Sequence, residues 1–418
     1  MSTPDNNTPP VKVDEVAESP AEDTPVVAAP SAVKKSVDKT AMARMFAEAI
    51  ASESHQPPDQ TKPTQAQLNA ATTDVDDDDE LPAPTRPKRS ENEEAEIMHI
   101  NCGDEEIQIN NIRLFSFDEL QLEKCTSCIH LEVRKNLIHE LAPSFPDLLA
   151  NNLVILDLFD NKIRKIPAGF FSNFKSLMKL DLSYNQIKNI ENLDCLGDTL
   201  CELYLIENRI KEVKGVDKLH NLRLLELGGN KIRGVGDALD KLGNLEELWL
   251  GKNKINDLST SLNKLKNLRR LGLQANRLIS INPENFPKGA NSNLEELYFS
   301  ENGLTSIENV QYLPKMHLID YSMNPVKAIN EEQINVKNMP ELEEFWLTDG
   351  RVDEWSEVDK FKQFEKSLTV VYLERNPIEQ HKRYRDKVFV ALPFLNQIDS
   401  WPIVNKADVE ADRSIHRR

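Results

Sequence analysis

The residues whose side chains are best suited to binding or catalysis recur at nearly regular intervals between residues 157 and 372. Each lies between two large apolar residues, as Trp249 lies between Leu248 and Leu250. The ten positions are Asp157, Asp181, Tyr204, Glu226, Trp249, Gly272, Tyr298, Asp320, Trp346 and Tyr372. Five are aromatic and four are acidic, which suits the recognition of a protein surface that carries Lys, Arg or His. Glu344 lies two residues before Trp346, so its side chain points to the same side of the strand, and it is a further candidate.

No spacing typical of a catalytic centre is present. The one close cysteine pair, Cys125-x-x-Cys128, has no second pair and no histidine at ligand spacing, so core or cap cysteines explain it better than zinc. The chain contains no G-x-x-x-x-G-K-[ST], H-E-x-x-H or G-x-S-x-G motif. The sequence therefore predicts a binding protein without a cofactor or metal, and not an enzyme.

The elements that position the ten residues are copies of one repeat motif. Its clearest copy is LEELWLGKNKI (Leu245–Ile255), which has the L-x-x-L-x-L-x-x-N-x-I spacing of a leucine-rich repeat. The other copies have their asparagines at Asn161, Asn185, Asn208, Asn230, Asn276, Asn302 and Asn324. Because no copy can bury its apolar face alone, we expect an α/β repeat solenoid with short parallel strands on its concave side. The ten residues then form one ladder on that side, since side chains alternate along a strand.

Most repeats are 22 or 23 residues long, which leaves room only for short 3-10 turns or brief helical pieces on the convex side. Ile107–Leu120 is expected to cap the N-terminal end, before a degraded copy at 131–138. In the copy Leu342–Val352 an aspartate, Asp349, stands where the asparagine is expected. The pattern of Gln380–Leu392, followed by proline, predicts a helix that closes the C-terminal end.

Composition separates the first 96 residues from the rest. Residues 1–95 hold 12 of the 23 prolines and none of the 14 glycines, so we expect 1–96 to be a disordered acidic tail. Within it, Val37–Ile50 is either a chance amphipathic stretch or a segment that folds on binding. The basic cluster 86–89 is either a solvated charge cluster or a nuclear-import signal. The expected organisation is a repeat domain over 97–404, with a cap at about 97–130, repeats at about 131–376 and a C-terminal cap at 377–404, and a loose tail over 405–418.

Charge and hydropathy limit the classes of partner and the cellular locations that can be expected. The net charge is −18 and the pI is near 5.0, which disfavours nucleic acid and favours a basic or metal-bearing partner. No run of about 18 apolar residues and no signal peptide is present, so no membrane contact is expected. Five cysteines without disulfide-scaffold spacing fit a reducing compartment. We expect a protein of the nucleus and cytoplasm that is a monomer when free.

Several segments resemble one family, the leucine-rich-repeat regulatory subunits of protein phosphatase 1. The resemblance covers roughly residues 110–400 and is most specific in the closing segment VYLERNPIEQHKRYRDKVFVALPFLNQID (371–399). It implies a non-catalytic subunit that grips the phosphatase catalytic subunit with its concave face, alongside a second regulator, inhibitor-3. The family's contact positions fall on Asp181, Tyr204, Glu226, Trp249, Asp320, Glu344, Trp346 and Tyr372, with Asp157 and Tyr298 as additional candidates.

An alternative remains open at this stage. A leucine-rich-repeat scaffold in an RNA–protein particle or a cytoskeletal assembly could share the short repeats and the cap. Direct RNA binding would call for a basic stripe, and the ladder contains no Lys or Arg.

Overall fold

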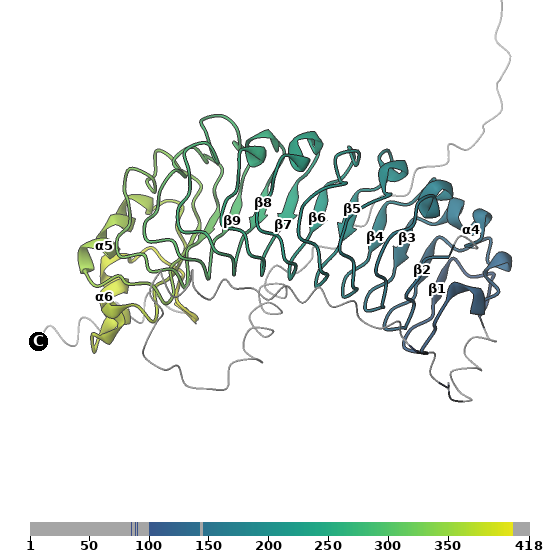
Figure 1. Ribbon diagram of the computed structural model, residues 1–418. Helices are drawn as coiled ribbons and strands as arrows, with labels where there is room; N and C mark the ends of the chain where they lie inside the picture. Colours follow the sequence, from purple (N-terminus) through teal and green to yellow (C-terminus); the bar gives the residue numbers. More distant parts are fainter. Residues whose placement is uncertain (1–84, 86–87, 89, 91–99, 143–144, 404–418) are drawn as a thin grey trace, which may run out of the picture. The chain divides into compact units, whose positions relative to one another are not determined.

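The repeats stack into a curved solenoid (Figure 1). The computed structural model describes residues 85, 88, 90, 100–142 and 145–403. Within them, strands pair in chain order to form one sheet, and every pairing is parallel except the last. The strands are β1 (Glu106–Gln108), β2 (His130–Glu132), β3 (Ile155–Asp157), β4 (Lys179–Asp181), β5 (Glu202–Tyr204), β6 (Leu224–Glu226), β7 (Glu247–Trp249), β8 (Arg270–Gly272), β9 (Glu296–Tyr298), β10 (Leu318–Asp320), β11 (Glu344–Trp346), β12 (Val370–Tyr372), β13 (Gln397–Ile398) and β14 (Trp401–Pro402).

Predictions for three segments fall outside the described residues. They concern the acidic tail 1–96 with its segment Val37–Ile50, the basic cluster 86–89 apart from Lys88, and the tail 405–418. These stay predictions.

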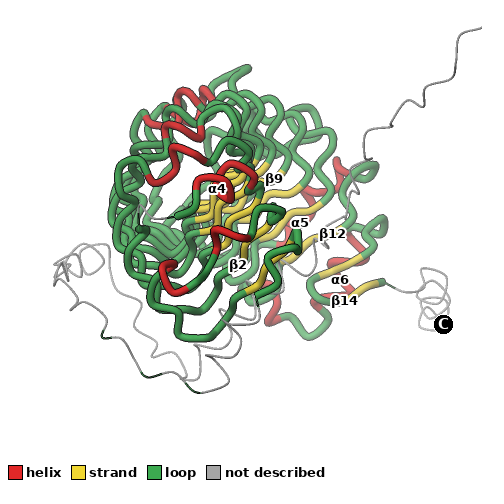
Figure 2. The backbone as a smooth tube through the Cα atoms, turned by 90° about the vertical axis from the view of Figure 1, so that its right-hand side faces the viewer, coloured by secondary structure: helices red, strands yellow, loops and turns green. Residues whose placement is uncertain are grey.

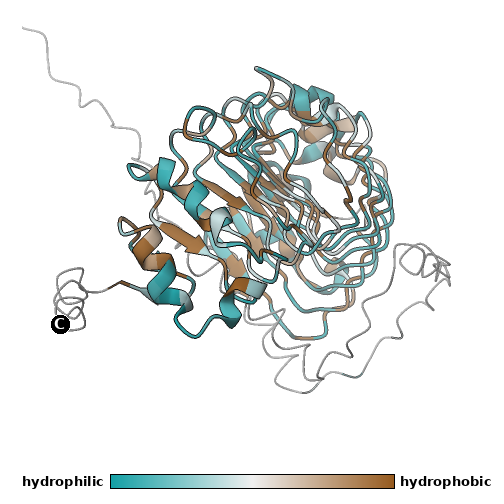
Figure 3. Cartoon of the chain, turned by 90° about the vertical axis from the view of Figure 1, so that its left-hand side faces the viewer, coloured by the Kyte–Doolittle hydropathy of each residue, from teal (hydrophilic) through white to brown (hydrophobic). Residues whose placement is uncertain are grey.

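Alternation along each strand separates the core from the surface. In β7 the central residue Leu248 and the following Leu250 are both fully buried, whereas Trp249 between them is half-buried. The same alternation recurs in register in successive repeats, where brown hydrophobic positions line up from one turn of the solenoid to the next (Figure 3). The apolar residues of the described repeats form one continuous core. The solenoid fold with short parallel strands is therefore confirmed.

Short helical turns lie on the side of the solenoid away from most of the sheet (Figure 2). As expected from the repeat length, they are 3-10 turns or short α-helices. The 3-10 turns are η1 (Phe117–Glu119), η2 (Leu122–Lys124), η3 (Phe170–Asn173), η4 (Asp194–Leu196), η5 (Ala238–Lys241), η6 (Ser261–Lys264), η7 (Lys360–Phe364) and η8 (Pro377–Gln380). The α-helices among the described residues are α4 (Asp147–Asn152), α5 (Trp355–Asp359) and α6 (Tyr384–Ala391).

The repeated asparagines form a ladder of buried hydrogen bonds. The side-chain Nδ2 of Asn253 donates to the carbonyl oxygens of Leu227 at 2.9 Å and Leu250 at 3.0 Å. It also donates to Gly251 O at 3.2 Å, while its Oδ1 accepts from Ile232 N at 3.0 Å. One side chain thus satisfies backbone groups of its own turn and of the previous repeat, which these groups require because they are buried.

The copy at Leu342–Val352 lacks the ladder asparagine, but the residue that replaces it is not the one predicted. Asp349 has φ 54°, the left-handed conformation that Lys252 has just before Asn253. Gly350 therefore occupies the ladder position, and the assignment of Asp349 to it was wrong by one residue. A Cβ at Gly350 would lie 2.7 Å from Asn376 Oδ1, so glycine leaves room for the next asparagine of the ladder.

The N-terminal cap segment contains a further repeat, which the asparagine-based motif did not identify. β1 pairs with β2 along its whole length, and Ile112 occupies the ladder position of this first repeat. The Asn136 side chain compensates, because its Oδ1 accepts from both Ile112 N at 3.1 Å and Leu114 N at 3.0 Å. An apolar ladder residue hides the repeat from a search anchored on asparagine.

Both cysteines of Cys125-x-x-Cys128 are fully buried at this end, in agreement with the core or cap interpretation. Cys125 forms a disulfide with Cys102, a pairing across 23 residues that their spacing did not indicate.

The C-terminal end is closed by more than the expected helix. α6 starts at Tyr384 instead of Gln380, and η8 precedes it. β13 then extends the sheet by pairing in parallel with β12, and β14 pairs antiparallel with β13 at the edge. Asp399 is fully buried between them, and its Oδ1 accepts hydrogen bonds from Leu373 N at 2.8 Å and Glu374 N at 3.0 Å.

One core tyrosine offers a simple test of hydrogen-bond satisfaction. Tyr321 is fully buried, and its hydroxyl has no hydrogen-bond partner among the described residues. Tyr321→Phe is expected to raise the free energy of unfolding by about 1 kcal/mol in urea titrations, because a buried unpaired hydroxyl is unfavourable. Tyr384→Phe is the matched control and should lower it, because the Tyr384 hydroxyl donates to Asp399 Oδ1 at 3.3 Å. Equal changes in both variants would contradict the expectation.

No helix in the described part of the chain is long and apolar enough to cross a membrane.

Candidate functional site

The ten predicted residues lie in one row across adjacent strands. Strand pairing places Asp157 beside Asp181 and continues in register, one residue per strand, to Tyr372. We call this the first row, and the surface that carries it the sheet face. The first row also extends over β2 and β1, through Glu132 and Gln108. The same apolar-x-apolar pattern at Leu131-Glu132-Val133 could have identified Glu132 from the sequence.

Four of the five aromatic members of the first row form a ladder of rings towards its C-terminal end. The ring centroids of Trp249 and Tyr298 are 5.6 Å apart, and those of Tyr298 and Trp346 are 6.3 Å apart. Tyr372 follows Trp346 at 5.2 Å. These distances are typical of favourable aromatic pairs. The four half-buried rings are therefore one contiguous surface and not scattered side chains.

Gly272 allows the first of these contacts. It lies in register between Trp249 on β7 and Tyr298 on β9. A Cβ at this position would be 2.4 Å from Cε3 of Trp249 and 2.8 Å from Oε1 of Gln274. The rings can thus meet across β8 because the residue between them has no side chain.

Gly272→Ala is accordingly expected to displace the Trp249 ring from Tyr298 and to lower the free energy of unfolding by about 1–3 kcal/mol. Near-ultraviolet circular dichroism and tryptophan fluorescence should change with it. Gly243→Ala is the matched control, because a Cβ there meets nothing within 4 Å. Identical aromatic spectra for Gly272→Ala and the wild type would show that the ladder does not depend on this glycine.

The acidic members of the first row are buried, unlike its half-buried aromatic members. Asp157, Asp181, Glu226 and Asp320 are at most 8% exposed. Each carboxylate turns along the chain and accepts a hydrogen bond from the backbone N–H two residues later, as Asp320 Oδ1 does from Ser322 N at 2.8 Å. The acids therefore support the loop after their strand as well as the sheet face.

Burial changes the ionisation of these acids. Loss of hydration raises the pKa of Glu226 to about 8, and repulsion by Glu247 and Asp181 adds to the shift. Burial likewise raises the pKa of Asp181, with repulsion by Asp157 as the next cause. It raises the pKa of Asp320 as well.

A second row, two residues earlier in each strand, shares the sheet face. Glu344 belongs to this row, in register with Leu318 and Val370, and not to the first row. Its Oε2 accepts from Trp346 Nε1 at 3.0 Å. The same Glu-x-aromatic contact occurs at Glu202–Tyr204, Glu247–Trp249 and Glu296–Tyr298, at 3.0, 3.3 and 2.9 Å. The recurring Glu-x-aromatic motif could have revealed these three glutamates, which the sequence analysis missed.

Basic side chains on the sheet face are paired with acids. Arg270 lies in the second row between Glu247 at 2.6 Å and Glu296 at 3.3 Å. Lys179 lies 3.4 Å from Glu202, and its ammonium group lies over the Tyr204 ring at 4.8 Å from the centroid. The sheet face therefore carries positive charge, but not as a free basic stripe.

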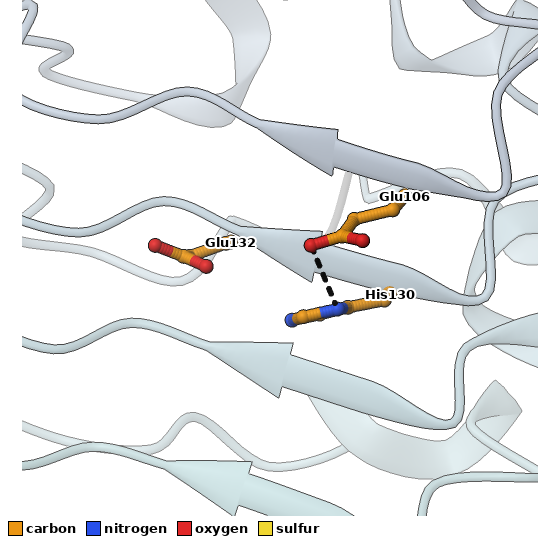
Figure 4. A group of neighbouring side chains, drawn as sticks. All are labelled: Glu106, His130 and Glu132. Atoms are coloured by element: carbon orange, nitrogen blue, oxygen red, sulfur yellow. Dashed lines mark ion pairs between the residues drawn. The ribbon is translucent and has the colours of Figure 1, made fainter.

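Glu106, His130 and Glu132 approach one another at the N-terminal end of the sheet face (Figure 4). Their potential ligand atoms lie within 4.8 Å of one another. His130 Nδ1 is 3.4 Å from Glu106 Oε1, and Glu132 Oε1 accepts from Asn110 Nδ2 at 2.7 Å. These protein contacts account for the arrangement without an ion.

A groove lies elsewhere, at the N-terminal ends of the central strands. It has a volume of about 590 Å³ and is lined by Ser176, Met178, Asp198, Thr199, Cys201, Asn221, Arg223, Asn244, Glu246 and Asn267. Asn221, Asn244 and Asn267 each donate to a carbonyl of the preceding repeat, at 2.7 to 2.9 Å. The groove is thus the edge of a second asparagine ladder with a structural role.

Comparison with known proteins agrees with this fold. Family models described as leucine-rich repeats match residues 151–210 and 284–418. Among solved structures, an internalin of Listeria monocytogenes superposes with a TM-score of 0.54 at 18% identity, over 74% of this chain and 89% of that one. A leucine-rich-repeat protein of Leptospira interrogans gives 0.52 at 21% identity, over 69% and 82%. The chain is a leucine-rich-repeat protein.

Curated relatives specify the resemblance within this class. The chain is similar to protein phosphatase 1 regulatory subunit 7, as the sequence analysis indicated. The Arabidopsis thaliana homologue of that regulator is 34% identical over 131 residues, which are 31% of this chain and 39% of the relative. The human protein is 47% identical over 49 residues, 12% of this chain and 13% of the relative. A Saccharomyces cerevisiae regulatory subunit of protein phosphatase 1 is 35% identical over 92 residues, 22% and 27%. The matched segments thus span less than two fifths of each of these relatives.

Proposed function

We propose that the chain is a non-catalytic regulatory subunit that binds the catalytic subunit of protein phosphatase 1 through the sheet face and controls its activity, maturation or location. The observation that carries the proposal is the contiguous ladder Trp249, Tyr298, Trp346 and Tyr372, edged by the glutamates of the second row. Contiguous aromatic surfaces mark protein interfaces, and Trp and Tyr dominate their hot spots. Relatives named as regulators of this phosphatase support the choice of partner.

The paired state of Lys179 and Arg270 disfavours direct nucleic-acid binding at this surface. A phosphate-backbone ligand needs several free cations and gives a steep dependence on salt. Binding beside inhibitor-3, a monomeric free state and a location in the nucleus and cytoplasm stay predictions.

Direct binding tests the proposal. The purified full-length chain and the catalytic subunit of protein phosphatase 1 should form a 1:1 complex by isothermal titration calorimetry and size-exclusion chromatography. Its affinity should fall far less steeply with salt than the affinity of a phosphate-backbone ligand does. No complex at micromolar concentrations, or capture of RNA in preference to the phosphatase, would overturn the proposed function.

A further inference from the structure

We infer that binding at the sheet face is coupled to the release of a proton from Glu226, so that partner affinity rises with pH. The inference rests on the proposed function and adds a form of regulation to the same surface. It follows from the position of one carboxyl group, from the charges around it and from the side chains already engaged nearby.

Glu226 lies in the first row between two aromatic residues. Strand pairing puts it in register with Tyr204 on β5 and with Trp249 on β7. Only 4% of the residue is exposed. Its Oε1 accepts from Gly228 N at 2.9 Å, and a Cβ at Gly228 would lie 2.9 Å from the same oxygen. The carboxyl group is therefore packed onto the sheet face directly beside the rings proposed to contact the partner.

The charged groups that face Glu226 are acidic. Glu247 comes from β7 and Asp181 from β4, and both repel a negative charge on Glu226. Glu202 on β5 is a further acid of the second row, and its carboxylate accepts a hydrogen bond from the Tyr204 hydroxyl.

The nearby cations are already engaged. Lys179 on β4 pairs with Glu202, while Arg270 on β8 pairs with Glu247. Among the described residues, no basic side chain forms an ion pair with Glu226 itself. A compensating charge for Glu226 must then come from outside the chain.

These surroundings make the neutral form the resting state. With a pKa raised to about 8, roughly nine in ten Glu226 side chains carry a proton at pH 7. A lysine or arginine of the partner that approaches Glu226 favours the ionised form, because an opposite charge within about 4–6 Å lowers the pKa of a carboxyl group. The proton leaves to the buffer as the new ion pair forms. Affinity must then increase with pH up to about 8 and level off above it.

Calorimetry in buffers of different ionisation enthalpy measures this proton directly. At pH 7, wild-type chain binding the phosphatase catalytic subunit should release about 0.9 proton more than Glu226→Gln does, since titrating groups of the partner contribute equally to both. The ratio of wild-type to variant affinity should rise at least roughly tenfold between pH 6 and 8. Glutamine retains an oxygen that can accept from Gly228 N, so the fold is expected to persist, as far-ultraviolet circular dichroism would verify.

Glu246→Gln is the control for net charge, because Glu246 lines the groove at the other ends of the strands. It should release as many protons as the wild type. Binding with equal proton release by wild type and Glu226→Gln would overturn this inference and leave the proposed function standing. Failure of the wild type to bind at every pH would overturn both.

Discussion

Replacing Asn253 by aspartate is expected to lower the free energy of unfolding by about 3–5 kcal/mol at neutral pH. The Asn253 amide group donates to the carbonyl oxygens of Leu227, Leu250 and Gly251, all in the buried ladder. A carboxylate accepts hydrogen bonds but cannot donate them. The substitution removes these three donations and places a negative charge against three carbonyl oxygens at a position that is 7% exposed.

Urea titrations of Asn253→Asp beside Asn244→Asp would test this expectation. Asn244 makes one such bond, to His220 O at 2.9 Å at an exposed position, so the control should lose about 1 kcal/mol or less. The loss for Asn253→Asp should shrink at low pH, because a protonated carboxyl group regains one donor and carries no charge. Similar losses in both variants would show that the inner ladder is no more important than the outer one.

The double variant Glu344→Ala/Trp346→Ala is expected to weaken binding of the phosphatase catalytic subunit by at least about 2 kcal/mol, roughly 30-fold in Kd. Trp346 contacts Tyr298 on one side and Tyr372 on the other. Its Nε1 donates to Glu344, which restricts the orientation of the ring. Loss of both side chains breaks the aromatic ladder in its middle, whereas the core residue Phe345 between them stays in place.

Titration calorimetry with the purified proteins measures the loss. Tyr312→Ala is the matched control, since Tyr312 is an aromatic residue 41% exposed outside the strands. It should bind like the wild type. The loss of binding free energy in the double variant should be smaller than the sum of the losses in the two single variants, because Glu344 acts partly by orienting Trp346. Wild-type affinity in a folded double variant would exclude this part of the sheet face as the contact surface.

Much of the fold could be predicted from periodicity. The spacing of leucines and asparagines predicted short parallel strands, the side-chain alternation and the register of the row from Asp157 to Tyr372, because neighbouring repeats can stack only with equivalent positions aligned. Prediction from periodicity fails where a repeat departs from the motif. Gly350 was overlooked because Asp349 beside it is chemically closer to asparagine, and the repeat of β1 was overlooked because Ile112 has no polar side chain.

The candidate site was predicted in composition but not in geometry. Glu226 and Asp320 belong to the row, yet both are buried because their carboxylates turn to N–H donors in the loop that follows the strand. Glu247 and Glu296 lie two residues before the row, as Glu344 does, and only strand pairing reveals Arg270 between them. Side-chain direction and pairing between repeats are set by contacts across about 23 residues, which a search within one repeat does not contain.

By itself, the sequence determined that the chain builds a leucine-rich-repeat solenoid and that aromatic and acidic side chains share one face of its sheet. These properties follow from repeat length and alternation, which are local. The tertiary structure alone decided that Trp249 reaches Tyr298 across Gly272, and that Glu226 lies buried among acids. Both depend on the space and the charge that neighbouring strands provide, because packing and hydration act through distances in three dimensions.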